Sequence, residues 1–291
     1  MKESIFCPAK INLFLEVLDK RDDGYHDIDT VMQSVTLFDK VSVCIESAKG
    51  TGSIVVKCDK EGVPSLESSE SNIVYKAARL FFQKAGIDAS AYDLEIEIEK
   101  QIPVCAGLGG GSTDAAGVLI LLDLMLNVYM GRDKLAQISA ELGADVPFCV
   151  LGGAYRGVGI GTTLERVPSL STELFICIAK GGSKVSTGHA YSMMDARSEE
   201  KRTSDKLISA LEKEDLAEIG YELFNAFQFV NDTDAVNNAI SVMKKCGALG
   251  ACLSGSGPSV FGIFFSIDDA DNAMKSLWAM GYEAFVASPV R

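Results

Sequence analysis

The stretch that decides the fold of this chain is Pro103-Val104-Cys105-Ala106-Gly107-Leu108-Gly109-Gly110-Gly111-Ser112-Thr113-Asp114. It follows an alternating segment and precedes an apolar segment that predicts a helix from about Ser112 to Asn127. Glycines permit positive φ angles and let backbone N–H groups come close to a ligand. The start of the helix adds unpaired N–H groups and a positive dipole end. The stretch therefore predicts a loop that binds a polyphosphate, with a tight structural turn as the alternative.

Two common phosphate-binding motifs are excluded by the details of this loop. A P-loop has a Lys directly after its last Gly, and here Ser112 follows Gly111 instead. A dinucleotide-binding loop follows a continuously apolar strand, whereas residues 94–99 alternate between apolar and acidic side chains, and the glycine spacing also differs. The loop therefore indicates a different family of nucleotide-binding proteins.

The residues before the loop predict strands and helices in turn. Residues 11–17 alternate with a period of two, which predicts a strand with one apolar face. Lys10 and Asn12 then lie on the same face, about 7 Å apart. Further strands are expected at 41–46 and 94–99, a loop at 61–71, and a helix that Asn72 opens and Gly86 closes.

The residues after the loop predict a second domain. A helix at 133–142 is followed by strand-like sequence from 146 to 167 and a boundary at Pro168 to Thr172. Beyond it we expect a strand at 174–179, a strand pair around Gly255, a helix at 269–280 and a last strand at 285–287. This order suggests a ferredoxin-like second half. We therefore predict an α+β protein with domains at 1–168 and 169–291.

The charge of the chain excludes some partners. Of its 291 residues, 27 are Lys or Arg and 40 are Asp or Glu, which gives a net charge of −13. Such a chain is a poor general binder of nucleic acid or of an anionic membrane. An anionic small molecule is not excluded, because nearby groups set the field in a cleft. The eight cysteines form no CxxC pair, and no signal peptide or membrane span is evident, so we expect a cytoplasmic protein.

Four ordered motifs resemble the GHMP kinases, a superfamily named after galactokinase, homoserine kinase, mevalonate kinase and phosphomevalonate kinase. Residues 103–113 resemble the second signature of that superfamily, and residues 253–261 resemble the third. Within it, residues 8–13 with Gly24-Tyr25-His26, and residues 142–148, are similar to the 4-diphosphocytidyl-2-C-methyl-D-erythritol kinases. The resemblance runs from Cys7 to about Phe265. It implies a two-domain α+β kinase fold with an N-terminal nucleotide-binding domain.

The resemblance also implies an activity. Members of that family use ATP to phosphorylate the 2-hydroxyl of 4-diphosphocytidyl-2-C-methyl-D-erythritol in the non-mevalonate isoprenoid pathway. Asp145 matches the general base of such kinases, although an Asp at a turn before a predicted strand is common for structural reasons alone. Lys10 matches the residue that orients the base and lowers the pKa of the acceptor hydroxyl. Asn12 matches a residue that contacts the acceptor.

Other residues are expected to contact the two substrates. By resemblance, Tyr25 stacks on the cytosine, His26 binds its edge, Tyr191 supplies a second ring and Thr187 lies near the substrate. The resemblance assigns the adenine to Asn72, Ile73 and Lys100, although Asn72 also suits a helix cap. The loop with Gly255 and Ser256 is expected to close over the substrate phosphates and brace the first glycine loop, or to be a structural hairpin.

The cofactors implied are ATP as co-substrate and Mg²⁺, for which the sequence shows no dedicated carboxylate cage. Two alternatives remain at this level. The chain could be another small-molecule kinase of the superfamily, of the mevalonate or homoserine type, or a non-catalytic kinase-like binding protein. Homoserine kinases lack the Asp base, and mevalonate kinases lack the Gly-Tyr-His segment. The presence of Lys10, Asp145 and the complete glycine loop speaks against a binding protein.

Overall fold

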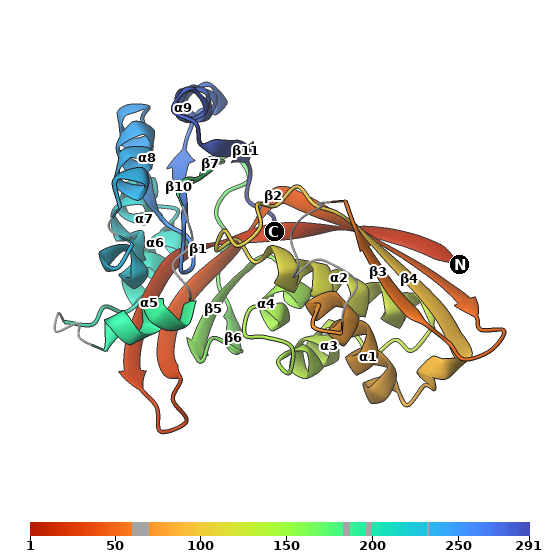
Figure 1. Cartoon of the computed structure of the whole chain (residues 1–291). Coiled ribbons are helices and arrows are strands. Elements are labelled where there is room, and N and C mark those ends of the chain that lie inside the picture. Colours follow the sequence, from red (N-terminus) through yellow and green to blue (C-terminus); the bar gives the residue numbers. More distant parts are fainter. Residues whose placement is uncertain (60–69, 183–186, 196–199, 232) are drawn as a thin grey trace. The chain divides into compact units, whose positions relative to one another are not determined.

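The computed structural model describes residues 1–59, 70–182, 187–195, 200–231 and 233–291 (Figure 1). The chain forms two compact units that do not follow its order. The first unit contains residues 1–9, 38–104 and 109–151, and the second contains residues 10–37, 105–108 and 152–291. The long strands β1 (Lys2–Lys20) and β2 (His26–Ser47) contribute to both units. The predicted boundary at residue 168 is a division along the chain, and it stays a prediction.

In the first unit, the end of β2 pairs antiparallel with β4 (Tyr92–Glu99), and β3 (Ile54–Cys58) pairs parallel with β4. Figure 1 shows helices α1–α4 gathered on one side of β3 and β4. Their bounds are α1 (Ile73–Ala85), α2 (Gly110–Met125), α3 (Arg132–Ser139) and α4 (Val146–Leu151), with a short 3-10 helix η2 (Ala89–Ala91) between α1 and β4. The predicted strands at 41–46 and 94–99 are confirmed.

Helix α1 begins and ends where the sequence predicts. The Asn72 side chain accepts a hydrogen bond from the Val74 N–H, and Gly86 has the left-handed φ of 67° that ends the helix. The buried side chains of α1 recur at helical spacing, on the face toward the core. Of the predicted loop at 61–71, residues 61–69 lie outside the described residues.

The prediction of strand-like sequence from residue 146 is wrong for its first six residues, which form helix α4. The run Val-Pro-Phe-Cys-Val-Leu is continuously apolar, and residues 146–150 are all buried. A run without apolar–polar alternation does not distinguish a buried strand from a buried helix. Pro147 suits the first turn of a helix, where a missing N–H costs no hydrogen bond. Asp145 therefore lies before a helix and not before a strand.

In the second unit, the start of β2 pairs with β5 (Ala154–Gly159), β5 pairs with β6 (Thr163–Arg166), and β1 pairs parallel with β8 (Phe224–Asn225). A separate antiparallel sheet has the order β11-β7-β10-β9. Its strands are β7 (Phe175–Lys180), β9 (Gly250–Leu253), β10 (Ser259–Phe264) and β11 (Glu283–Ala287).

The helices of the second unit complete its core. They are α5 (Thr187–Met194), α6 (Asp205–Lys213), α7 (Leu216–Glu222), the 3-10 helix η3 (Ala226–Phe229), α8 (Asp234–Lys245) and α9 (Ile267–Ala279). Helices α8 and α9 pack on the sheet, where Val260 and Phe264 are almost fully buried among their apolar side chains. Around this sheet the elements follow the order β7-α8-β9-β10-α9-β11, with α5, α6, α7, β8 and η3 inserted between β7 and α8, and this confirms the predicted ferredoxin-like arrangement.

Strand β1 differs from its prediction in one respect. The alternation of residues 11–17 predicts one apolar face, yet the opposite face is buried as well. Lys10, Asn12 and Glu16 are 4%, 2% and 0% exposed. Buried polar groups are tolerated when they are hydrogen-bonded. These side chains are therefore held in a polar network, which contributes to the site described below.

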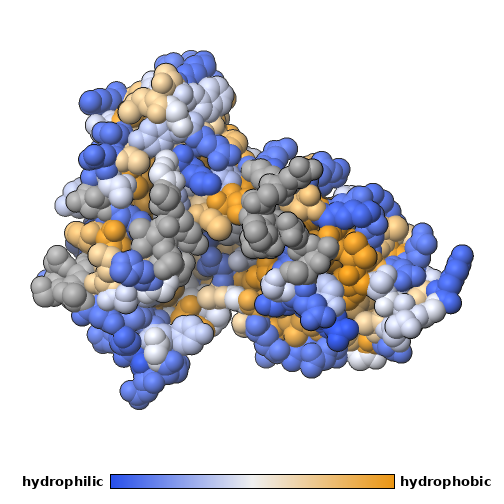
Figure 2. All heavy atoms as spheres, in the orientation of Figure 1, coloured by the Kyte–Doolittle hydropathy of each residue, from blue (hydrophilic) through white to orange (hydrophobic). Residues whose placement is uncertain are grey.

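The surface accounts for much of the acidic charge. Glu95 and Glu99 on β4 form ion pairs with Lys57 and Lys40 of the neighbouring strands β3 and β2, and Glu97 pairs with Lys2 of β1; these side chains are 37–58% exposed. Figure 2 shows hydrophilic side chains over much of the face that it presents. None of the eight cysteines forms a disulfide, and four of them are buried. Among the described residues, no helix is long and apolar enough to cross a bilayer.

Candidate active site

The glycine loop ends in an open helix N-terminus. Gly107 and Gly109 have φ angles of 81° and 72°, and even Cys105 has a positive φ of 57°. The backbone of Gly109 caps α2, and its first intrahelical bond runs from the Thr113 N–H to the Gly109 carbonyl. The N–H groups of residues 110–112 therefore come before the helical bonding pattern and remain available for an anion. The predicted loop is present, and its helix begins two residues earlier than expected.

The middle of the loop, residues 105–108, contacts the second glycine-rich loop within the second unit. Ser254 Oγ donates to the Gly107 carbonyl at 3.2 Å, and the Ser259 N–H donates to the Ala106 carbonyl at 3.2 Å. A Cβ on Gly107 would lie only 2.3 Å from the Ser254 carbonyl oxygen. The two backbones approach each other so closely that only glycine fits. The expected bracing of one loop by the other is therefore observed.

Lys10 and Asn12 lie together on β1, as their spacing predicts. Lys10 Nζ donates to Asn12 Oδ1 at 2.7 Å, and the Gly255 N–H donates to the same oxygen at 2.9 Å. Asn12 Nδ2 donates to Thr30 Oγ1 at 2.9 Å. The Lys10 N–H also donates to the Leu108 carbonyl at 2.9 Å. One strand thus connects the predicted catalytic lysine with both glycine-rich loops.

The segment predicted to bind the cytosine contains one exposed aromatic ring and one buried ring. Tyr25 is 65% exposed on a turn, whereas His26 is buried and stacks on Tyr191 with a ring distance of 5.3 Å and an angle of 26°. His26 Nε2 lies 2.7 Å from Asp195 Oδ1, and Lys20 Nζ lies 2.6 Å from the other oxygen. Lys20, and then His26, lower the pKa of the Asp195 carboxyl. Thr187 is the first residue of α5.

Sequence reasoning missed Asp195, and no local pattern marks it. It lies just past the end of α5, 169 positions from His26. An acidic residue at the end of a helix is ordinary in a sequence, and its partners become visible only in the folded chain. The pairing matters because a carboxylate that accepts from Nε2 fixes which ring nitrogen of a histidine carries the proton.

Asn72 and Ile73, expected at the adenine, lie beside the start of α2. A Cβ on Gly111 would be 3.6 Å from Ile73 Cγ2. Asn72 uses Oδ1 to cap α1, while its buried Nδ2 has no hydrogen-bond partner among the described residues, and the same holds for Thr113 Oγ1. Buried polar atoms usually have partners. These two atoms therefore suit a polar ligand such as a nucleotide.

Asp145 directly precedes α4 in the first unit, and its side chain is half-buried. Its carbonyl accepts a hydrogen bond from the Cys149 N–H at 3.1 Å, so its backbone is fixed by the first turn of the helix. Lys10 belongs to the second unit, and the pairing of these two residues stays a prediction.

Lys100, the third residue expected at the adenine, is buried between two carboxylates. Its Nζ donates to Asp39 Oδ2 and to Asp114 Oδ2. A lysine at the end of a strand is commonly solvated, whereas this residue is only 6% exposed. Sequence reasoning did not identify Asp39, because Lys40 follows it directly and further polar residues such as Ser42 lie nearby in β2, so no local pattern marks its burial.

No group of three or more His, Cys, Asp or Glu side chains among the described residues could hold a metal ion. The described carboxylates therefore do not form a protein cage for Mg²⁺. Mg²⁺ often keeps several waters and binds through substrate phosphates.

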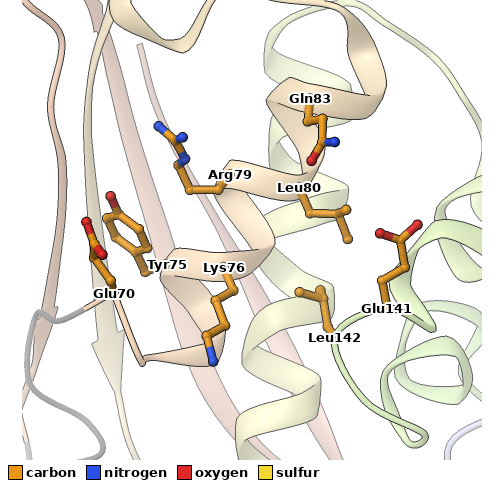
Figure 3. Close-up of a pocket in the computed structure, with 8 residues that line it drawn as sticks. All are labelled: Glu70, Tyr75, Lys76, Arg79, Leu80, Gln83, Glu141 and Leu142. Carbon is orange, nitrogen blue, oxygen red and sulfur yellow. The ribbon is translucent and has the colours of Figure 1, made fainter.

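The first unit also has a surface groove of about 450 Å³ (Figure 3). The outer face of α1 lines it with Tyr75, Lys76, Arg79, Leu80 and Gln83, and Glu70, Glu141 and Leu142 complete it. Glu141 is paired with Lys84 at 2.6 Å. The groove contains none of the predicted site residues, and the signs of its charges are mixed.

Comparison with known proteins decides the family. Residues 72–153 match the family model described as GHMP kinases N terminal domain, and residues 207–282 match GHMP kinases C terminal. The 4-diphosphocytidyl-2-C-methyl-D-erythritol kinase of Caldicellulosiruptor saccharolyticus is 39% identical over 272 residues, which cover 92% of this chain and 90% of the relative. That of Acetivibrio thermocellus is 36% identical over 290 residues, 99% of each chain. The chain belongs to the 4-diphosphocytidyl-2-C-methyl-D-erythritol kinase family.

A solved structure agrees with this assignment. The crystal structure of 4-(cytidine 5'-diphospho)-2C-methyl-D-erythritol kinase matches with a TM-score of 0.75 and 27% identity, over 99% of this chain and 100% of that one. The predicted GHMP kinase fold is therefore confirmed. As a member of this GHMP kinase family, the chain is an ATP-dependent small-molecule kinase.

Proposed function

We propose that this kinase transfers the γ-phosphoryl group of ATP to the 2-hydroxyl of 4-diphosphocytidyl-2-C-methyl-D-erythritol, in the non-mevalonate route to isoprenoid precursors. The observation that carries the proposal is the similarity over 99% of the chain to a kinase of that name. The open N–H groups at the start of α2 support it, because they suit the phosphates of the donor. The proposal includes an N-terminal domain at 1–168 and a C-terminal domain at 169–291.

Phosphoryl transfer asks a protein for positioning and charge stabilisation. In this proposal, the N–H groups of residues 110–112 and the dipole of α2 hold the ATP phosphates. Asn72 Nδ2 and Ile73 contact the adenine end, and residues 103–109 form the rest of the wall. Mg²⁺ bound to the phosphates would offset their charge. The protein contributes hydrogen-bond donors whose positions are set by the fold before ATP binds.

The acceptor side uses Asp145 as the general base. A carboxylate within hydrogen-bond reach of the 2-hydroxyl accepts its proton as the oxygen attacks phosphorus. The Lys10 ammonium favours the charged form of that carboxylate and stabilises the developing alkoxide. Asn12 holds Lys10 Nζ through Oδ1 and keeps one N–H of its amide for the acceptor. The roles of these three residues are part of the proposal.

The cytidyl group is held by rings in this proposal. Tyr25 is exposed enough to lie on one face of the cytosine, and Tyr191 supplies the second ring. His26 binds the edge of the base, and Thr187 lies near the substrate. Gly255 and Ser256 cover the diphosphate from the second glycine-rich loop. Aromatic rings on the faces of a base are a rigid means of recognition.

Tyr25→Ala is expected to raise the KM for the cytidyl substrate by roughly 10-fold, since stacking on one base contributes about 1–3 kcal/mol. The KM for ATP should stay within about twofold, because in this proposal Tyr25 contacts the cytosine and no atom of ATP. Steady-state kinetics with each substrate varied in turn measure both constants. Tyr221→Ala, at a tyrosine that is 76% exposed on α7, serves as control and should change neither. An equal rise in both constants would contradict the stacking role.

The acceptor is tested by ADP release with three compounds in parallel. We expect release with 4-diphosphocytidyl-2-C-methyl-D-erythritol and none above background with mevalonate or homoserine. If ADP were released only with mevalonate or only with homoserine, that compound would be the acceptor and the proposed substrate would be wrong. Release with none of the three, from protein that is folded, would favour a kinase-like binding protein.

A further inference from the structure

Three charged side chains lie buried together in the first unit. Asp39 comes from β2, Lys100 directly follows β4, and Asp114 belongs to α2, with side-chain exposures of 0%, 2% and 1%. Lys100 Nζ donates to Asp39 Oδ2 and, at 2.8 Å, to Asp114 Oδ2. An unpaired charge at such depth would cost several kcal/mol, so the three groups depend on one another.

The contacts of this cluster lie at both ends of the glycine loop. Asp39 Oδ1 accepts the N–H groups of Gln101 at 2.7 Å and Ile102 at 2.8 Å, directly before the loop. Asp114 lies in α2, directly after the loop. A Cβ on Gly110 would lie 3.1 Å from Lys100 Nζ, so the ammonium lies against the first residue of the helix. One buried cation therefore connects the residues that precede the loop with the helix that follows it.

The negative charge of the cluster is also partly balanced, which matters for a neighbouring phosphate. Burial raises the pKa of Asp114 to about 7, against the opposing effect of Lys100. Burial lowers the pKa of Lys100, but the two carboxylates outweigh it and raise that pKa overall. With Lys100 charged, the cluster carries at most one net negative charge, and the raised pKa of Asp114 favours a smaller one. It therefore repels an anion at the start of α2 only weakly.

We propose that Asp39, Lys100 and Asp114 are positioning residues for the glycine loop, which they hold at both ends so that the N–H groups of residues 110–112 face the phosphates of ATP. This inference rests on the ATP site of the proposed function. Lys100 Nζ is already bound by two carboxylates, so we assign it a role behind the loop instead of the contact with adenine that the resemblance implies. The cluster acts through backbone geometry and touches no reacting atom.

The deciding variant is Asp39→Asn. The amide oxygen can still accept the two backbone N–H groups, but the charge that holds Lys100 is lost. We expect the dissociation constant of MgATP to rise roughly 10- to 100-fold, because displacement of a binding group by about 1 Å has effects of that size. Asp114→Asn should raise the dissociation constant of MgATP less, by about threefold, since an amide resembles the protonated carboxyl. Lys100→Met should raise the dissociation constant of MgATP most, because it leaves two buried carboxylates without a cation.

The matched control is Lys40→Met. Lys40 and Glu99 are the sequence neighbours of Asp39 and Lys100, and they form an ion pair across the same two strands that is 37% and 58% exposed. Exposed pairs contribute little. MgATP binding to this variant should stay within about twofold of the wild type.

Binding is measured by calorimetry with MgATP and no acceptor, well below the melting temperature of each variant. Amide hydrogen exchange of residues 101–113 is measured alongside, and Asp39→Asn should raise it there and leave β7–β11 unchanged. Steady-state kinetics should show a higher KM for ATP with the KM of the acceptor unchanged. If Lys100→Met does not fold, Asp39→Asn decides.

Wild-type binding of ATP by Asp39→Asn, with wild-type exchange in the loop, would overturn the proposal, even if this variant melts at a lower temperature. Because the binding assay contains no acceptor, it separates two failures. A wild type that binds MgATP but phosphorylates none of the three acceptors would refute the proposed substrate and leave the positioning role to be decided by Asp39→Asn. A wild type that binds no MgATP would overturn both.

Discussion

Asp145→Asn is expected to lower kcat by roughly 10²- to 10⁴-fold, the range in which general base catalysis contributes. The carboxamide has nearly the same shape as the carboxylate but cannot take the proton of the acceptor hydroxyl. The backbone contact of Asp145, in which its carbonyl accepts from the Cys149 N–H, does not involve the side chain and should survive. The variant should therefore fold, and its KM values should change by only a few fold.

The control for this variant is Asp215→Asn. Asp215 begins α7, and its side chain caps the Glu218 N–H at 3.1 Å, so the same change is made at the start of another helix. Asn is as good a cap as Asp, and turnover should remain at the wild-type level. Single-turnover kinetics with saturating ATP measure the chemical step. Turnover of Asp145→Asn within about threefold of the wild type would remove Asp145 as the base.

Gly107→Ala is expected to lower kcat/KM by about 100-fold or more. The new Cβ would lie 2.3 Å from the Ser254 carbonyl oxygen, where ordinary contacts begin near 3.4 Å. The neighbour is backbone and cannot swing away, so residues 105–108 must separate from residues 254–259. A shift of about 1 Å in a group that positions substrate can cost about 10²-fold in rate. The free energy of unfolding should also fall, by about 1–3 kcal/mol.

The matched control is Gly131→Ala. Gly131 has a φ of 82°, close to the 81° of Gly107, but nothing lies within 4 Å of its Cβ position. It therefore has the same backbone strain, about 1–2 kcal/mol, without the collision. Stability is measured by denaturant unfolding and activity by ADP release. If Gly107→Ala and Gly131→Ala lost activity to the same small extent, the close approach of Gly107 to Ser254 would be unimportant for activity.

The sequence by itself determined the elements whose rules are local. The cap at Asn72 and the left-handed Gly86 define α1 through backbone chemistry within a few residues. The alternation of residues 94–99 defines β4, since every second side chain faces the core. The glycine loop was also readable, because its backbone angles depend on the residues that adopt them. Helix α4 could not be predicted from the sequence, because its apolar residues are continuous and show neither helical nor strand periodicity.

Only the tertiary structure decided which polar and charged groups meet. Lys100 and Asp39 are 61 positions apart, and Asn12 and Gly255 are 243 apart, so no spacing in the chain relates them. A lysine after a strand would ordinarily be solvated, and its burial becomes favourable only where the fold supplies two carboxylates to offset the loss of water. The sequence thus determined the loop that can hold a phosphate. The fold decided what holds that loop, because long-range pairing of buried charge depends on the assembled core.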